Sequence, residues 1–337
     1  MKNAKLKIKK EGVPKAHNYN SIAKRFIHFA FYIFNFSLMF GFPAFAVVGQ
    51  AGTDIAILNA GVGARPLGMG GAFTAVADNA DAPYWNPAGL GFLTSSEITT
   101  MQTRLATDAD HYYLSYIQPA LGGTIGISWI QVGMGTITQT SGEVDQHNEV
   151  INLNVFSYFS SAYLFAYGKE INQHLSLGIT GKYLTSDMTQ INGGQASGYS
   201  ITPGILMKIT ERTTTRVVPT LMIGIKVDEL VNSQQWGTGT VENVPPKLRL
   251  GLAYLEPKVN SLFSLDISQT IRSNYSPEIA AGYEWKSDGL SLRAGYTDGL
   301  TFGAGFTAGI VTLDYAYVQQ KALSTSNVQR ISLSGKW

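Results

Sequence analysis

Apolar side chains alternate with small or polar ones along most of the chain after Ile98, and this period of two constrains the fold most strongly. In 300–309, leucine, phenylalanine and alanine alternate with threonine and glycine. In 311–318, valine, leucine and two tyrosines alternate with threonine, aspartate and alanine. A helix would repeat its apolar positions every 3.6 residues, so these segments are predicted to be β-strands with one apolar face.

Segments with this alternation are long and numerous. Transmembrane barrel strands have about 9–11 residues, and bacterial single-chain barrels contain even numbers of strands. The sequence therefore predicts an all-β fold, a transmembrane antiparallel β-barrel of about fourteen strands over 94–337, although twelve or sixteen strands would also fit. The predicted strands are 98–105, 111–118, 123–132, 155–167, 175–186, 198–209, 220–230, 247–256, 261–270, 278–286, 290–298, 300–309, 311–319 and 328–337.

Composition limits what can cover such a sheet. Charged residues make up 14% of the chain, whereas soluble proteins average roughly 25%. No apolar run long enough for a membrane-spanning helix lies beyond residue 50. A lipid-facing barrel, a fibrous β protein and an all-β sandwich remain as alternatives. The longest predicted connections, 133–154 and 231–246, would emerge at the same barrel end, and a sandwich has no reason to sort its loops in this way.

The two faces of the predicted strands differ in chemistry. One face is apolar and is expected to contact lipid, with aromatic residues such as Tyr254 and Trp285 near strand ends. The other face carries charges of both signs, and a basic residue facing lipid at mid-bilayer costs about 2–4 kcal/mol. That face must line the lumen, where its charges either are hydrated or pair with each other and with a plug. The predicted lumen charges are Arg249, Asp266, Glu284, Arg293, Asp314 and Arg330.

Residues 1–46 resemble an export signal. Eight basic residues precede an apolar run from about Phe29 to Phe42, and Ala44-Phe45-Ala46 has the form of a signal peptidase site. A single uncleaved membrane anchor is the alternative. Without this segment, which has eight basic residues and one acid, 17 basic and 22 acidic residues remain, a net charge of −5. Nucleic acid is therefore not an expected partner.

Residues 47–93 lack strand alternation and are rich in glycine and alanine. Fourteen strands enclose a lumen wider than wall side chains can fill. This segment is predicted to be a hatch inside the barrel. The alternative is an extension that lies outside it.

The block Gly63–Leu90, with G-A-R-P-L-G-M-G-G-A-F and Y-W-N-P-A-G-L, resembles the N-terminal signature of the PorV/PorQ family. That family belongs to the superfamily of the long-chain fatty acid transporter FadL, whose hatch carries an Asn-Pro-Ala box like Asn86, Pro87 and Ala88 here. The C-terminal strands also resemble the PorV/PorQ end. The resemblance implies a fourteen-stranded outer-membrane barrel with an internal hatch.

Two function classes follow from the resemblance. FadL-type relatives pass hydrophobic small molecules across the outer membrane. PorV-type relatives receive secreted protein cargo in type IX secretion and surface attachment. Pro203 lies inside a predicted strand and removes a ladder hydrogen bond there, so it marks either a side exit toward lipid or a local bulge.

Signatures of catalysis are missing from the sequence. It lacks a G-x-S-x-G elbow, an H-E-x-x-H motif and a P-loop, and it contains no cysteine. The protein is expected to be non-catalytic, with no cofactor and no metal. Its expected partners are outer-membrane lipid, the hydrophobic molecule or protein cargo, and the barrel assembly machinery, which reads aromatic C-terminal residues such as Trp337.

Overall fold

The computed structural model describes residues 56–105, 109–210, 219–271, 275–319 and 327–337. The predicted signal peptide, 1–46, and the start of the predicted hatch, 47–55, lie outside the described residues.

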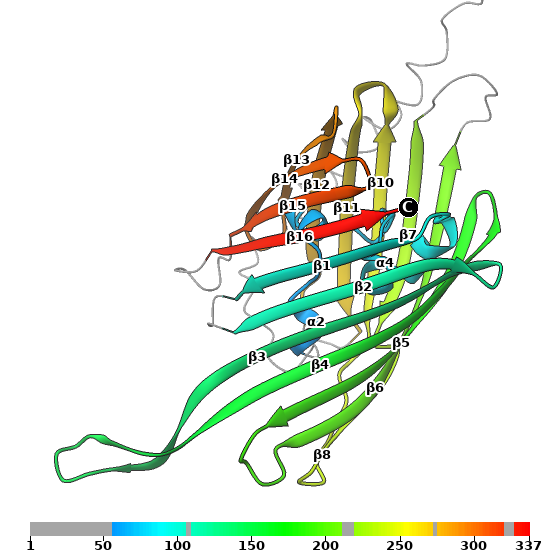
Figure 1. Cartoon of the computed structure of the whole chain (residues 1–337). Helices are drawn as coiled ribbons and strands as arrows, with labels where there is room; N and C mark the ends of the chain where they lie inside the picture. The colour runs from blue at the N-terminus through cyan, green and yellow to red at the C-terminus, as the bar shows by residue number, and fades with distance from the viewer. Residues whose placement is uncertain (1–55, 106–108, 211–218, 272–274, 320–326) are drawn as a thin grey trace, which may run out of the picture. The chain divides into compact units, whose positions relative to one another are not determined.

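Sixteen antiparallel strands form one continuous sheet (Figure 1). Strands β8 (Val231–Trp236) and β9 (Val241–Glu242) form a side hairpin, and pairing of β5 with β6 closes the other fourteen into a barrel. The predicted fold and strand count are therefore confirmed. The barrel strands are β1 (Glu97–Arg104), β2 (Asp110–Ala120), β3 (Gly123–Val144), β4 (Val150–Asn172), β5 (Leu175–Met188), β6 (Gln195–Thr210), β7 (Thr220–Asp228), β10 (Lys247–Glu256), β11 (Ser261–Thr270), β12 (Glu278–Ser287), β13 (Leu290–Tyr296), β14 (Leu300–Ala308), β15 (Val311–Val318) and β16 (Val328–Lys336).

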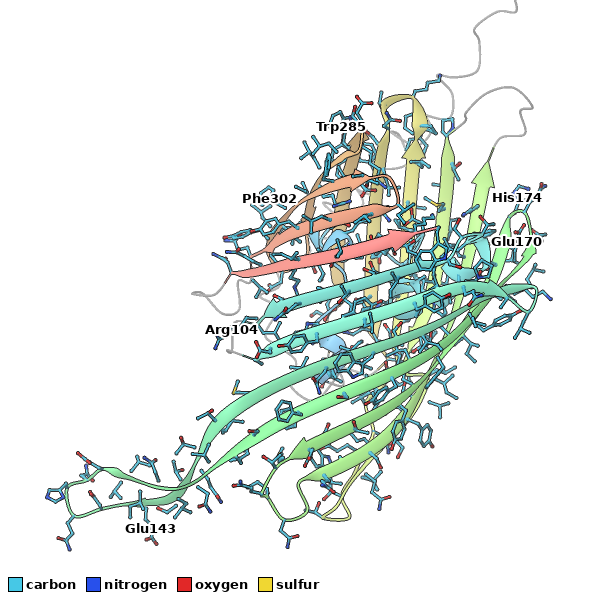
Figure 2. All side chains as sticks on the ribbon, viewed as in Figure 1. Arg104, Glu143, Glu170, His174, Trp285 and Phe302 are labelled. Atoms are coloured by element: carbon cyan, nitrogen blue, oxygen red, sulfur yellow. The ribbon has the colours of Figure 1, made fainter. Side chains whose placement is uncertain are left out.

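The barrel is apolar outside and charged inside. Phe302, Leu313 and Ile331 are 50%, 51% and 55% exposed on its outer surface, and Figure 2 shows such side chains on the outside of the wall. Arg293 and Asp314, which lie on the opposite faces of their strands, are only 5% and 7% exposed. A water-soluble β protein would show the reverse distribution.

The inner face of the first half of the barrel differs from the small and polar face that strand alternation predicted. Tyr113, Ile130, Leu164, Leu184 and Leu206 point inward from β2 to β6 and are buried in one apolar cluster. This cluster includes residues of the predicted hatch, so the plug supplies the apolar contacts that make these positions favourable. The charged inner face is mainly a property of β7 and β10–β16.

The two stretches predicted to be long loops contain strands. The predicted loop 133–154 forms the outer parts of β3 and β4, which pair beyond the last residues that bond to β2 and β5 (Figure 1). We refer to residues 134–157 as the β3–β4 ribbon. Its pairing is irregular, with a register shift between Met134 and Ile137, where Thr136 has a φ of 61°. The second predicted loop, 231–246, contains β8 and β9.

The two barrel ends differ in their connections. Several links at one end are tight turns, such as Leu121-Gly122 and Asp288-Gly289, whose residues all have positive φ angles, as type I′ two-residue hairpins require. We refer to this end as the turn end and to the end that carries the β3–β4 ribbon as the loop end. Among the described residues, no helix is long and apolar enough to span a membrane.

Candidate functional site

The candidate site is the barrel lumen, which residues 56–93 fill as a compact hatch. The hatch consists of short helical turns that contact the inner faces of both barrel halves. Its alanines and glycines keep these turns thin enough to pack directly on the wall. The turns are α2 (Ala56–Asn59), α3 (Ala64–Gly68), α4 (Ala82–Trp85) and the 3-10 helix η1 (Pro87–Phe92), and a second 3-10 helix, η2 (Pro257–Val259), lies outside the hatch between β10 and β11.

A belt of glycines on the inner wall allows the hatch backbone to approach closely. A Cβ atom at Gly178 would lie 2.2 Å from the carbonyl carbon of Pro87, and one at Gly224 would lie 2.2 Å from the Thr74 oxygen. On the other side of the barrel, a Cβ at Gly295 would lie 2.3 Å from the Gly70 nitrogen. Real Cβ atoms do not approach so closely, so the belt is matched in shape to the hatch. The belt glycines are Gly168, Gly178, Gly204, Gly224, Gly251, Gly282 and Gly295.

The Asn86-Pro87-Ala88 motif lies where the hatch meets β5 and β6. Asn86 is fully buried, and its side-chain oxygen accepts from the Ala88 nitrogen at 3.1 Å. Its amide nitrogen donates to the carbonyls of Thr74 and Ile205, at 2.8 and 3.2 Å. The Ala88 carbonyl accepts from Ser176 of β5 at 2.6 Å. The motif thus caps η1 and joins two hatch segments to the wall.

Predicted lumen charges meet the hatch through a buried ion-pair chain. Glu284 accepts from Nε and Nη2 of Arg65 in α3, at 2.8 and 2.9 Å. Glu284 also accepts from Arg293, which donates to Asp314 at 2.7 Å. Arg65 further pairs with Asp78 of the hatch. Arg293 is therefore connected to Arg65 of the hatch through Glu284.

The other predicted lumen charges have different roles. One Asp266 oxygen accepts from the backbone nitrogens of Phe73 and Thr74, at 3.1 and 2.9 Å. Arg330 donates to the Gly61 carbonyl at 3.3 Å. Arg249 donates to Asp228, a wall residue, at 2.6 Å.

Sequence reasoning missed two cations that hold the hatch. Arg65 lies within the Gly63–Leu90 block but was not selected as a functional residue. Lys226 of β7 donates to the Tyr84 carbonyl at 2.9 Å and pairs with Asp228 at 2.7 Å. The sequence could have indicated that Lys226 faces the lumen, because it alternates with the outward-facing apolar residues Ile223 and Ile225. Arg65 lies in the short helix α3, so strand alternation could not indicate its direction.

Pro203 lies in β6 at the position where the neighbouring strand changes. Residues 204–210 of β6 pair with β7, and residues 196–201 pair with β8. Between those two strands, Glu229 has a φ of 55° and its side chain pairs with Lys182 at 2.5 Å. Pairing of Pro203 with Ile179 on the other side is regular. Pro203, which has no N–H to donate, thus lies beside the irregular segment between β7 and β8.

The pKa values of two buried hatch carboxylates are shifted in opposite directions. Burial raises the pKa of Asp81 to about 7, aided by the nearby carboxylates of Glu97 and Asp314. Burial would also raise the pKa of Asp78, but the Arg65 guanidinium outweighs it and lowers this pKa below its ordinary value. Asp78 is therefore a fixed anion, whereas Asp81 can titrate near neutral pH.

Cavities border the hatch and lie at the loop end. One, of about 430 Å³, is at the turn end and is lined by charges such as Asp78, Lys286 and Lys336. A second, about 160 Å³, lies between the hatch and β10–β13. Another, of about 300 Å³, lies at the loop end and is lined by the apolar Met188, Ile191 and Trp236 together with polar residues such as Thr238 and Glu242. Among the described residues, no three His, Asp or Glu side chains are grouped as metal ligands.

A profile described as "Uncharacterised protein family (UPF0164)" matches residues 47–337. The chain belongs to UPF0164. No curated protein matches the sequence. The PorV/PorQ resemblance of this UPF0164 chain therefore stays a prediction.

Solved structures similar to the UPF0164 chain include transport channels. The Pseudomonas putida toluene transporter TodX matches 82% of this chain and 99% of its own, at 14% identity and a TM-score of 0.54. A TodX deletion mutant, described as a monoaromatic hydrocarbon channel, matches 82% and 97%, at 14% identity and a TM-score of 0.51. A Pseudomonas aeruginosa FadL homologue matches 80% and 96%, at 12% identity and a TM-score of 0.48. The UPF0164 chain shares the barrel fold of TodX.

Proposed function

We propose that this UPF0164 protein is a bacterial outer-membrane channel that admits hydrophobic small molecules without catalysis. The observation that carries the proposal is the closed fourteen-stranded barrel, with its fold shared with a toluene transporter over 82% of the chain. The outward apolar face supports insertion in lipid, because a closed barrel satisfies its backbone hydrogen bonds internally. Export through a cleaved signal peptide and assembly by the barrel machinery are parts of the same proposal.

The loop-end cavity suits the capture of an apolar molecule. Met188, Ile191 and Trp236 offer apolar and aromatic surface in this cavity. Methionine adapts its shape to different ligands, and a tryptophan ring buries a large apolar area. From there, the molecule would reach the hatch, whose displacement or rearrangement would control passage.

Uptake of a simple hydrocarbon tests the proposal. Cells that carry the protein in their outer membrane should take up ethylbenzene from dilute solution faster than cells of a deletion strain. Replacing Trp236 with Ser should slow this uptake, whereas replacing Leu121, an exposed turn-end residue, with Ser should not. Equal uptake with and without the protein would rule out the channel function.

A second candidate is the handling of secreted protein cargo, as in type IX secretion. The β3–β4 ribbon supports it, because Leu153 and Val155 are 53% and 50% exposed beyond the paired part of the barrel wall. Shortening the ribbon between Ile137 and Phe156 would test it. Loss of surface-attached proteins from cells, with hydrocarbon uptake unchanged, would favour the cargo function over transport.

A further inference from the structure

The two sides of the hatch are attached to the barrel wall in different ways. From β4 to β13, the hatch backbone packs directly on the glycine belt, and Arg65 pairs with Glu284 of β12. The strands β1, β2 and β16, which the structure describes throughout, present no glycine to the lumen. Their inward positions are mainly polar, with residues such as Thr99, Ser115 and Ser332. We refer to the side of the hatch that faces these three strands as the polar side.

Hydrogen bonds to wall side chains hold the polar side. The Ala80 carbonyl accepts from Ser115 at 2.7 Å and from Tyr113 at 3.3 Å. Ser332 accepts from the Ala64 nitrogen at 2.8 Å. Water can replace each of these bonds, whereas parting the hatch from the glycine belt gives up close-packed contacts that water does not replace.

The polar side also contains buried polar atoms without partners. In the described part of the chain, neither ring nitrogen of His111 has a hydrogen-bond partner, and neither do Nε of Arg330 and Oδ1 of Asp81. These three residues are 0%, 3% and 2% exposed. A buried polar atom without a partner is costly, and opening on this side lowers that cost because it admits water.

A cavity already reaches the polar side at the turn end. The cavity of about 430 Å³, here named the turn-end cavity, is lined by Asn79 of the hatch, Glu97 of β1 and Ser334 of β16. It therefore borders the segment Asn79–Asp81. A movement of this segment away from β1 and β2 would extend the cavity into the barrel.

The charge of Asp81 affects whether this segment stays closed. Burial and the nearby carboxylates of Glu97 in β1 and Asp314 in β15 raise the pKa of Asp81 to about 7. Asn79, which donates to Oδ2 at 2.8 Å, and Arg65 of α3 favour the charged form and offset this rise only in part. Asp81 therefore gains its charge near neutral pH, next to two other carboxylates.

The closed hatch leaves no room for solvent around Asp81. A Cβ atom added at Gly63 would overlap the carboxylate, and Tyr113 of β2 lies near it. The charged carboxylate is hydrated only when the segment moves away from the wall, so ionisation favours the open arrangement.

We propose that the hatch opens on its polar side, between Asn79–Asp81 and the strands β1, β2 and β16, and that loss of the Asp81 proton favours the open state. This inference rests on the proposed channel function, because the opening would be the passage past the hatch. The side of the hatch on the glycine belt stays in place. A rise in pH then shifts the population from the closed to the open state.

Thiol labelling of two matched serines tests the side of opening. Ser115 and Ser176 are both fully buried, and each donates to a hatch carbonyl, to Ala80 at 2.7 Å and to Ala88 at 2.6 Å respectively. The native chain contains no cysteine, so Ser115→Cys and Ser176→Cys each carry a single thiol. The full-length variants in detergent are labelled with a water-soluble methanethiosulfonate at pH 6 and pH 8. Each rate is divided by the rate of the same variant in denaturant, which removes the pH dependence of the thiol itself.

The corrected rate at position 115 should rise about tenfold from pH 6 to pH 8, as expected for a pKa near 7 in the closed hatch and an ordinary value in the open one. The rate at position 176 should not rise. Ser332→Cys, at another position of the polar side, should respond as Ser115→Cys does. Asp81→Asn cannot ionise and should abolish the rise at position 115. Equal changes at positions 115 and 176, or an unchanged rise in Asp81→Asn, would overturn the proposal.

Ethylbenzene uptake by cells separates the two proposals. Uptake above that of the deletion strain, with equal labelling at positions 115 and 176, would refute only the proposed opening. Preferential labelling at position 115 without such uptake would refute the channel function.

Discussion

Arg65 joins the hatch to the barrel wall through a buried ion pair. It joins Glu284 of the wall to Asp78 of the hatch, and Glu284 is 2% exposed. Loss of one partner of a buried ion pair leaves an uncompensated charge and typically costs about 3–5 kcal/mol. The whole chain of pairs, including Arg293 and Asp314, would lose its connection to the hatch.

Replacement of Arg65 with Met should therefore loosen the hatch while the barrel remains closed. Cells that carry Arg65→Met should become more sensitive to bulky antibiotics that the native outer membrane excludes. Lys169→Met, at an exposed position, is the matched control and should leave sensitivity unchanged. Unchanged sensitivity of an Arg65→Met protein present at native levels would argue against this role.

Asp81 should make the hatch more stable at acid pH. Its pKa in the folded protein is about 7, above the ordinary 3.8, so stability falls as pH rises from about 4 to about 7. Glu97 and Asp314 oppose ionisation of Asp81, Tyr113 packs nearby, and Arg65 offsets this only in part.

The expected effect of Asp81 is on the order of a few kcal/mol, since one pKa unit corresponds to about 1.4 kcal/mol. Thermal unfolding followed from pH 4 to pH 8 would measure it. Asp81→Asn should flatten this part of the profile. A native profile that does not fall over this range, or an Asp81→Asn profile that falls as steeply, would contradict the role of Asp81.

At the scale of elements, the strand–hatch contact depends on glycine. Gly178→Ala should destabilise the plugged barrel, because the added Cβ would overlap the Pro87 backbone. Overpacking of this kind costs about 1–3 kcal/mol. Gly181→Ala in the same strand is the control, since the nearest atom to its added Cβ is 4.0 Å away. Thermal unfolding should show a lower transition temperature for Gly178→Ala alone.

A strand could be predicted from the sequence where one of its faces contacts lipid and the other lines the lumen. Strands such as β14 and β15 separate lipid from lumen, so alternation marks them clearly. The β3–β4 ribbon has exposed residues on both faces, so no such contrast exists there, and it was predicted to be a loop. The ion pair of Arg65 with Glu284 joins residues 219 positions apart, and the glycine belt also depends on contacts between distant parts of the sequence. Strand periodicity does not encode such contacts.

At the scale of the whole molecule, the barrel combines a lipid-like exterior with an interior that the hatch fills. The outward face of β14 to β16 carries Phe302, Leu313 and Ile331, whereas Arg293 and Asp314 are buried inside.

Ile331→Lys should therefore reduce assembly in the membrane, because lysine facing mid-bilayer lipid costs about 2–4 kcal/mol. Gln319→Lys, at an exposed loop-end position, should assemble normally. The ratio of folded to unfolded protein on unheated gels would measure this difference.

Spin labelling tests the orientation of the wall most directly. The native chain contains no cysteine, so Ile331→Cys and Ser334→Cys each provide a single labelling site. Ile331 is 55% exposed on the outer face, and Ser334 lines the turn-end cavity. In liposomes, lipid-dissolved oxygen should relax the label at position 331, and a water-soluble nickel reagent should relax the label at position 334. Relaxation of the label at 331 by nickel but not by oxygen would contradict the lipid-facing barrel.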